Sequence, residues 1–145
     1  MRIEVNVVGI PAPQGSLSRG FGQKMFYSNA ERLKLWRHMI ISELIEATPP
    51  KWDIDSPIAV TAEFRFTRPS SHFKASGGLT KRAPELKTTY PDLDKLGRSV
   101  GDSIEQSKVV RNDSQIIGWK MNKRWATSDE HPGVYILIEP VILPQ

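Results

Sequence analysis

The sequence contains no cysteine among its 145 residues. This absence excludes disulfide bonds, thiolate zinc sites and cysteine nucleophiles, and it is compatible with a reducing cytoplasm. Histidine is also scarce: His38, His72 and His131 lie far apart, and no two of them have the spacing of a metal-binding pair. The sequence therefore offers neither thiolate ligands nor paired imidazole ligands for a metal.

Long apolar runs are absent as well. The sequence begins Met-Arg-Ile-Glu-Val-Asn, and no apolar run in it is long enough for a signal peptide or a membrane span. Hydrophobic residues make up 39% and charged residues 25% of the chain, without internal repeats or low-complexity tracts. We therefore expect one globular, cytoplasmic domain over residues 1–145 that makes no use of a membrane.

Positive charge is concentrated in two segments, although the net charge of the whole chain is only +4. Residues 64–91 hold six basic side chains and one acid, and residues 108–125 hold five basic side chains and one acid. Such segments suit binding to a phosphate backbone, with an ordinary solvated basic face as the alternative. Tyr90 is a further candidate, for stacking on an unpaired base. The candidate DNA-binding residues are Arg68, Lys74, Lys81, Arg82, Lys87, Tyr90, Lys120, Lys123 and Arg124.

Hydrophobic periodicity predicts four strands and two helices. Alternating apolar and polar residues are typical of half-buried strands, and apolar residues three or four positions apart are typical of amphipathic helices. In chain order, the expected elements are a strand at 2–8, a helix at 30–47, a strand at 58–67, a helix at 93–106 and strands at 115–124 and 133–142. This order predicts an α+β fold, with a mixed sheet of about four strands and the helices on one side.

Two long connections separate these elements. Residues 9–29 are rich in glycine, proline, serine and glutamine, and residues 69–90 contain prolines, glycines and several hydroxyl residues. Loops of this length inside a compact domain are usually functional or disordered. Because residues 69–90 are basic and directly precede a cluster of acids, we expect them to form a flap that contacts DNA.

The acids that follow this loop are the most informative part of the chain. Asp92 and Asp94 lie at the expected start of a helix, and Asp113 precedes the next strand, where the chain can return to the helix start. A hard cation such as Mg²⁺ takes oxygen ligands, and one or two carboxylates plus substrate phosphates can complete its shell. The alternative is structural, because aspartate at an N-cap or in the first turn also stabilises a helix.

Arg98 and Asp102 continue the face of Asp94 at successive spacings of four residues. A cation one turn from a metal ligand can keep that carboxylate ionised and can also contact a phosphate. Ordinary ion pairing on a helix surface is the alternative. The residues alone thus favour metal-dependent phosphodiester chemistry within a basic surface.

Three segments together resemble the RusA family of Holliday junction resolvases, small endodeoxyribonucleases common in phages and prophages. They are Pro91-Asp92-Leu93-Asp94-Lys95-Leu96, Val100-x-Asp102 and Asn112-Asp113-Ser114-Gln115-Ile116. Phage-type members are also similar at Gly9-Ile10-Pro11-Ala12-Pro13-Gln14-Gly15-Ser16 and at Arg68-Pro69-Ser70-Ser71-His72.

The resemblance implies a RusA-like homodimer that binds four-way DNA junctions and cuts two opposed strands symmetrically. The implied cofactor is Mg²⁺, for which Mn²⁺ can substitute, with no small-molecule cofactor. Asp92, Asp94 and Asp113 are implied to be catalytic, metal-binding carboxylates. Arg98 takes the place of the lysine typical of the family and is a further catalytic candidate, and Asp102 matches a supporting acid. The expected location is the cytoplasm of a bacterial or phage-infected host cell.

Two other functions stay open at this point. One is a broader nuclease for flaps or other branched DNA, built on the same site. The other is a non-catalytic DNA-binding module in which the acids only cap a helix. A pure binding module gains nothing from acids where phosphate must approach, because they oppose the attraction that basic residues supply. Three acids between two basic segments therefore favour an enzyme.

Overall fold

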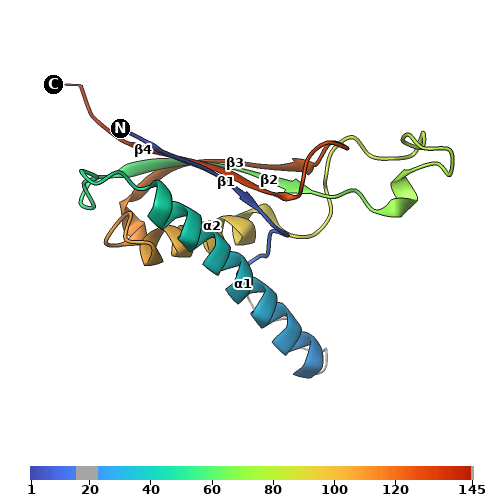
Figure 1. Cartoon of the computed structure of the whole chain (residues 1–145), viewed down its shortest axis with the longest axis horizontal. Coiled ribbons are helices and arrows are strands. Elements are labelled where there is room, and N and C mark those ends of the chain that lie inside the picture. Colours follow the sequence, from blue (N-terminus) through green and yellow to red (C-terminus); the bar gives the residue numbers. More distant parts are fainter. Residues whose placement is uncertain (16–22, 145) are drawn as a thin grey trace.

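A four-stranded mixed sheet with two helices packed on one face forms the fold (Figure 1). The computed structural model describes residues 1–15 and 23–144, with the backbone alone for residues 23–28. The elements are β1 (Ile3–Val8), α1 (Gln23–Ala47), β2 (Ile58–Phe66), α2 (Leu93–Gln106), β3 (Ile116–Trp125) and β4 (Gly133–Pro140), with the 3-10 helices η1 (Ser70–His72) and η2 (Asp113–Gln115). The strand order is β1-β4-β2-β3, in which β2 and β3 are parallel and the other neighbours antiparallel. The predicted α+β fold is confirmed.

The element bounds agree with the periodicity except at the start of α1. Helix α2 has the predicted bounds, and each strand bound lies within two residues of its prediction. Helix α1 begins at Gln23, so the prediction of a loop was wrong for residues 23–29. Serine and asparagine, the residues at 28–29, favour N-caps, but inside a helix each lowers its stability by only roughly a few tenths of a kcal/mol. In addition, α1 contains neither proline nor glycine, so nothing in its sequence interrupts the helix. The earlier part of that predicted loop includes residues 16–22, which lie outside the described residues.

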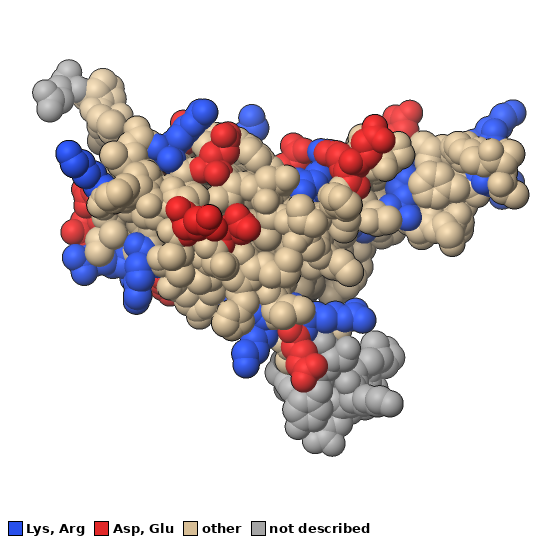
Figure 2. Space-filling view, viewed as in Figure 1, with Lys and Arg blue, Asp and Glu red and all other residues tan. Residues whose placement is uncertain are grey.

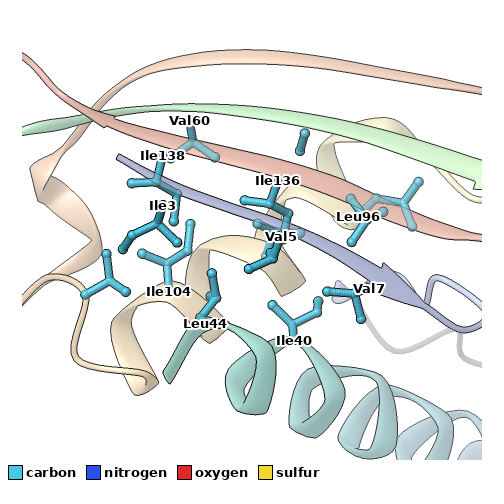
Figure 3. Packing of buried hydrophobic residues seen from close by; sticks show 14 of the residues in the cluster. Ile3, Val5, Val7, Ile40, Leu44, Val60, Leu96, Ile104, Ile136 and Ile138 are labelled. Carbon is cyan, nitrogen blue, oxygen red and sulfur yellow. The ribbon is translucent and has the colours of Figure 1, made fainter. Parts of the chain in front are cut away.

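The helices and the sheet share one hydrophobic core (Figure 3). Helix α2 buries Leu96, Val100 and Ile104 completely, and each contributes roughly 1.5–3 kcal/mol by its burial. The buried Ser99 and Ser103 on the same helix donate their hydroxyl hydrogens to main-chain carbonyl oxygens within it, at 2.8 and 2.7 Å. This packing fixes α2 against the sheet and therefore sets the direction of its exposed face. Among the described residues, no helix combines the length and apolar character that crossing a membrane requires.

Arg124 joins β3 to two other parts of the chain. Its Nε donates to Glu63 on β2 at 2.6 Å, and its terminal nitrogens donate to the two oxygens of Glu130 at 2.6 and 2.7 Å. The guanidinium, together with the backbone N–H of Thr127, lowers the pKa of Glu130 from 4.5 to about 2. Because Glu130 lies in the connection between β3 and β4, these pairs tie that connection to the sheet.

Acid should weaken the fold partly through Glu130. As the pH falls from about 4.5 to about 2, the unfolded chain takes up a proton at this position before the folded chain does, so this component of stability is lost. Because Glu130→Gln cannot titrate, the difference in unfolding free energy between wild type and this variant should shrink across that window. Urea denaturation at about pH 2 to 7 measures the difference, with Glu43→Gln on the exposed side of α1 as the control. A difference that does not change with pH would contradict this role.

Residues 69–90 form an arm that extends beyond one end of the sheet (Figure 1). Next to η1, an isolated antiparallel β-bridge pairs Phe73 with Leu79. Their side chains are 44% and 47% exposed. Between them, Gly77 and Gly78 adopt φ angles of 90° and 78°, a backbone conformation that favours glycine. Lysine and arginine side chains lie on the outer end of the arm (Figure 2). The arm thus exposes apolar and basic side chains together.

Candidate active site

A pocket with a volume of about 400 Å³ opens between α2 and β3. The segment before α1 and the 3-10 helix η2 complete its wall. The lining residues are Gln14, Asp94, Gly97, Arg98, Gly101, Asp102, Asp113, Ile116, Trp119 and Met121. The structure therefore brings together four residues that the sequence singled out: Asp94, Arg98, Asp102 and Asp113.

Helix α2 presents three of these side chains on one face. Asp94, Arg98 and Asp102 follow one another at four-residue spacings, so they lie on consecutive turns. The opposite face of the helix is held by the core. Asp94 lies in the first turn, at the positive end of the helix dipole.

Two glycines on α2 leave room for the pocket. A Cβ atom at Gly97 would lie 2.5 Å from Met121 Sδ, and one at Gly101 would lie 3.5 Å from Trp119 Cζ2. Glycine costs a helix interior about 1 kcal/mol relative to alanine. In α2 these two glycines allow the helix to lie close to β3. Larger side chains at these positions would fill the groove between the helix and the strand.

Asp92 stands at the N-cap of α2 but is not one of the residues that line the pocket. Within the described chain its side chain makes no capping hydrogen bond, and its Oδ2 lies 3.6 Å from Lys95 Nζ in an ion pair. Asp92 thus has the position of a capping residue but not the side-chain hydrogen bond of one. Its carboxylate is exposed two residues before Asp94.

Asp113 reaches the pocket on a tightly held turn. Asn112 accepts a hydrogen bond from the backbone N–H of Ser114 at 2.8 Å, and the Gln115 side chain accepts one from the N–H of Asn112 at 3.1 Å. The N–H of Asp113 itself donates to Glu105 Oε1 on α2 at 2.9 Å. The backbone of Asp113 is thus fixed against α2 while its carboxylate is exposed.

Gln14 is a pocket residue that the sequence reasoning did not assign to the site. Its side-chain Nε2 donates to Asp102 Oδ2, and its backbone N–H donates to the carbonyl oxygen of Lys95 at 2.9 Å. Two bonds thus attach the segment before α1 to α2. The one available signal was the similarity of residues 9–16 to phage-type relatives, which carried no role for this glutamine.

The acids suit a cation that is shared with a substrate. The described residues contain no group of three or more carboxylate, imidazole or thiolate side chains gathered as a metal site. Of the three predicted metal ligands, Asp94 and Asp113 line the pocket and Asp92 does not. Two carboxylates are sufficient to hold Mg²⁺ when water and phosphate oxygens complete its shell. The hard oxygen donors of this open pocket therefore fit such a cation.

Four of the predicted DNA-binding cations are instead committed to contacts within the chain. Arg68 donates to a backbone carbonyl oxygen of the arm at 2.7 Å, and Arg124 is held by the two glutamates described above. Lys87 is only 8% exposed, and Lys123 donates to two backbone carbonyl oxygens at 2.7 and 2.8 Å. The donors of these four residues already have partners that the sequence does not reveal, so a contact with DNA would require them to exchange those partners, and their DNA-binding role stays a prediction.

The other candidates are exposed. Lys74, Lys81 and Arg82 lie on the arm, Lys120 lies on β3, and the side chain of Tyr90 is 71% exposed at the end of the arm. These residues remain available for phosphate contacts or for base stacking.

Comparison with known proteins identifies the family of the chain. A model of the family described as Endodeoxyribonuclease RusA matches residues 9–139, a range that includes the arm and every residue lining the pocket. None of the curated proteins compared with the chain matches it. The family match covers nearly the whole chain and confirms the resemblance seen in the sequence. The chain belongs to the RusA family of endodeoxyribonucleases, structure-specific nucleases that act on Holliday junctions.

Proposed function

We propose that this enzyme resolves four-way DNA junctions by paired, symmetric incision as a Mg²⁺-dependent homodimer. The observation that carries the proposal is the pocket shared by Asp94, Arg98, Asp102 and Asp113 in a chain of this family. Carboxylates can act on a phosphodiester through a cation, and a guanidinium can bind it directly.

In this proposal Asp94 and Asp113 hold the cation, for which Mn²⁺ can substitute. When bound there, the cation would supply Lewis-acid chemistry, by which the scissile phosphate would be polarised, a water molecule activated and the leaving oxygen stabilised. The protein contributes the placement of the two carboxylates. Asp94 projects from a helix that the core holds in place, and Asp113 projects from a turn whose backbone is hydrogen-bonded to α2.

Arg98 is proposed to bind the phosphate itself. It is exposed and lies one helical turn from both Asp94 and Asp102. Its planar guanidinium can donate two parallel hydrogen bonds to phosphate oxygens, which a lysine cannot do. Asp102, whose carboxylate accepts a hydrogen bond from Gln14, is proposed to help orient Arg98 from the next turn.

Asp92 is proposed as a third residue that would hold the cation. Its carboxylate would then have to break the ion pair with Lys95, whose Nζ lies 3.6 Å from Asp92 Oδ2. The Asp92 side chain is 60% exposed. Exposed ion pairs of this kind contribute about 1 kcal/mol or less, so the movement has a small cost.

A homodimer is proposed because two incisions require two pockets. The described residues of one chain supply one pocket with this set of side chains. A two-fold axis between identical subunits would present two such pockets to the opposed strands of a pseudo-symmetric junction.

Removing divalent cations should abolish cleavage without abolishing junction binding. EDTA is expected to stop symmetric nicking of a labelled four-way junction, and added Mg²⁺ or Mn²⁺ is expected to restore it. Binding in EDTA should persist, because the exposed basic residues contact phosphate without a cation. Nicking that continues in EDTA would overturn the cation requirement, and a monomer in sedimentation under cleaving conditions would overturn the dimer.

A flap and a linear duplex of matched sequence separate the other two functions. Cleavage of the flap as fast as the junction would favour a broader nuclease for branched DNA. Binding to the junction with no cleavage of any substrate would favour the non-catalytic module.

A further inference from the structure

Lys87 and Lys123 donate hydrogen bonds to the backbone segment 89–91, which leads into α2. Lys123 Nζ, on β3, donates to the carbonyl oxygens of Thr89 at 2.7 Å and Pro91 at 2.8 Å. Lys87 Nζ, near the end of the arm, donates to the carbonyl oxygen of Tyr90 at 2.9 Å and to Thr89 Oγ1 at 3.0 Å. Three consecutive carbonyl oxygens are therefore each bound by an ammonium group.

The ammonium of Lys87 also rests on aromatic rings at the end of the sheet. It lies 4.7 Å from the ring centroid of Phe66, the last residue of β2, and 4.6 Å from that of Trp125, the last residue of β3. On the same tryptophan, the Arg68 guanidinium lies 5.4 Å from the ring centroid, and the His72 ring packs edge-on at 5.1 Å. Cation–π contacts of this kind hold the base of the arm against the ends of two strands.

The environment of Lys87 is electrostatically unfavourable apart from these contacts. Burial, and then the nearby charge of Lys123, lower the pKa of Lys87. Bringing two like charges together in a partly desolvated place is unfavourable. The carbonyl oxygens at 89–91 are the acceptors that offset this cost. Lys87 is only 8% exposed, and its ammonium already donates to two acceptors within the chain.

We infer that Lys123 and Lys87 are positioning residues that fix the start of α2 relative to β3 and the arm. We call the contacts of Lys87 and Lys123 with residues 89–91 the lysine clamp. Asp92 follows Pro91 directly and Asp94 lies two residues further, so the clamp sets where both carboxylates stand. The arm and the pocket are thereby joined through one rigid connection. This inference rests on the proposed function, because it gives the clamp its role in placing the acids of the nuclease site.

Lys123→Met tests the clamp against a phosphate contact. Methionine keeps the apolar stem but removes both carbonyl bonds, so cleavage of a saturated junction should fall roughly 10–100-fold, as small misplacements of reacting groups do. Junction affinity and its salt dependence should stay at the wild-type values. The matched comparison is Lys120→Met on the same strand. If that exposed lysine contacts phosphate, its loss should weaken binding and reduce the salt slope by about 1.

Hydrogen exchange of the free protein tests the same clamp without DNA. Backbone amides of residues 88–95 should exchange faster in Lys123→Met than in wild type, and Lys120→Met should match wild type there. Thr89→Val, which removes only the hydroxyl bound by Lys87, is a milder variant expected to raise exchange in the same segment if Lys123→Met does not fold.

Two results would overturn the inference. One is unchanged exchange together with unchanged cleavage in Lys123→Met. The other is weakened junction binding with a smaller salt slope in that variant, which is the pattern of a phosphate contact. If the wild type cuts no junction at all, the proposed function fails, while the exchange experiment still decides whether the clamp exists.

Discussion

Asp94→Asn should reduce junction cleavage by at least roughly 100-fold, since loss of even an outer partner of a metal ligand typically costs 10–100-fold. Asp94 lines the same pocket as Asp113 and Arg98, on the first turn of a helix that the core fixes. Asparagine preserves the shape of the side chain but removes its charge. Of the two carboxylates proposed to hold the cation from inside the pocket, one would then remain, and affinity for a hard cation falls with ligand charge.

Junction binding by Asp94→Asn should persist or rise slightly, because removing an acid near the phosphates reduces repulsion. Single-turnover cleavage of a labelled four-way junction with Mg²⁺ and a binding assay at the same salt concentration measure the two effects separately. Asp129→Asn is the matched control, as an exposed acid in the connection between β3 and β4 that does not line the pocket. Cleavage at the wild-type rate by Asp94→Asn would remove this residue from the site. A parallel loss of binding and cleavage would instead indicate a damaged fold.

The predictable parts of the fold are those that local pattern determines. Helix α2 is predictable because Asp92 at its N-cap is followed by Leu96, Val100 and Ile104 at helical spacing. The start of α1 is not, because the serine and asparagine at 28–29 favour either an N-cap or, at small cost, a helix interior, and only the surrounding structure decides. The strand order β1-β4-β2-β3 is likewise hidden, since it pairs segments that are far apart in the chain.

The same distinction applies to the pocket. Asp94 and Asp102, with the arginine between them, can be placed on one face from helical periodicity alone. The hydrogen bond from Gln14 to Asp102 joins residues 88 positions apart, so no local sequence pattern predicts it. The charges of Lys87 and Lys123 are visible in the sequence, but their carbonyl partners are brought near by the packing of the arm on the sheet. A basic residue in a nuclease sequence is therefore weak grounds for a DNA contact until its partners within the fold are known.

Gly133→Ala should lower the free energy of unfolding by about 3 kcal/mol, the upper end of the usual range for overpacking. Gly133 begins β4 and pairs with Val8 on β1. A Cβ atom there would lie 2.0 Å from the carbonyl oxygen of Val7 and 2.8 Å from Arg65 Nη2. The Val7 carbonyl is backbone held in the β1–β4 pairing, so it cannot turn aside as a flexible side chain would. The strand must separate from β1 or shift, and β4 is an interior strand of the sheet.

Gly118→Ala on β3 supplies the control for Gly133→Ala. The nearest atom to a Cβ at Gly118 is Ala59 Cβ at 3.7 Å, an ordinary contact. Alanine there should leave stability unchanged or raise it by up to about 1 kcal/mol, because it restricts the unfolded chain. Urea denaturation of the two variants and the wild type measures both effects. If Gly133→Ala were as stable as Gly118→Ala, β4 would not lie as close to the Val7 carbonyl oxygen as the structure places it. The register of the β1–β4 pairing would then be contradicted as well.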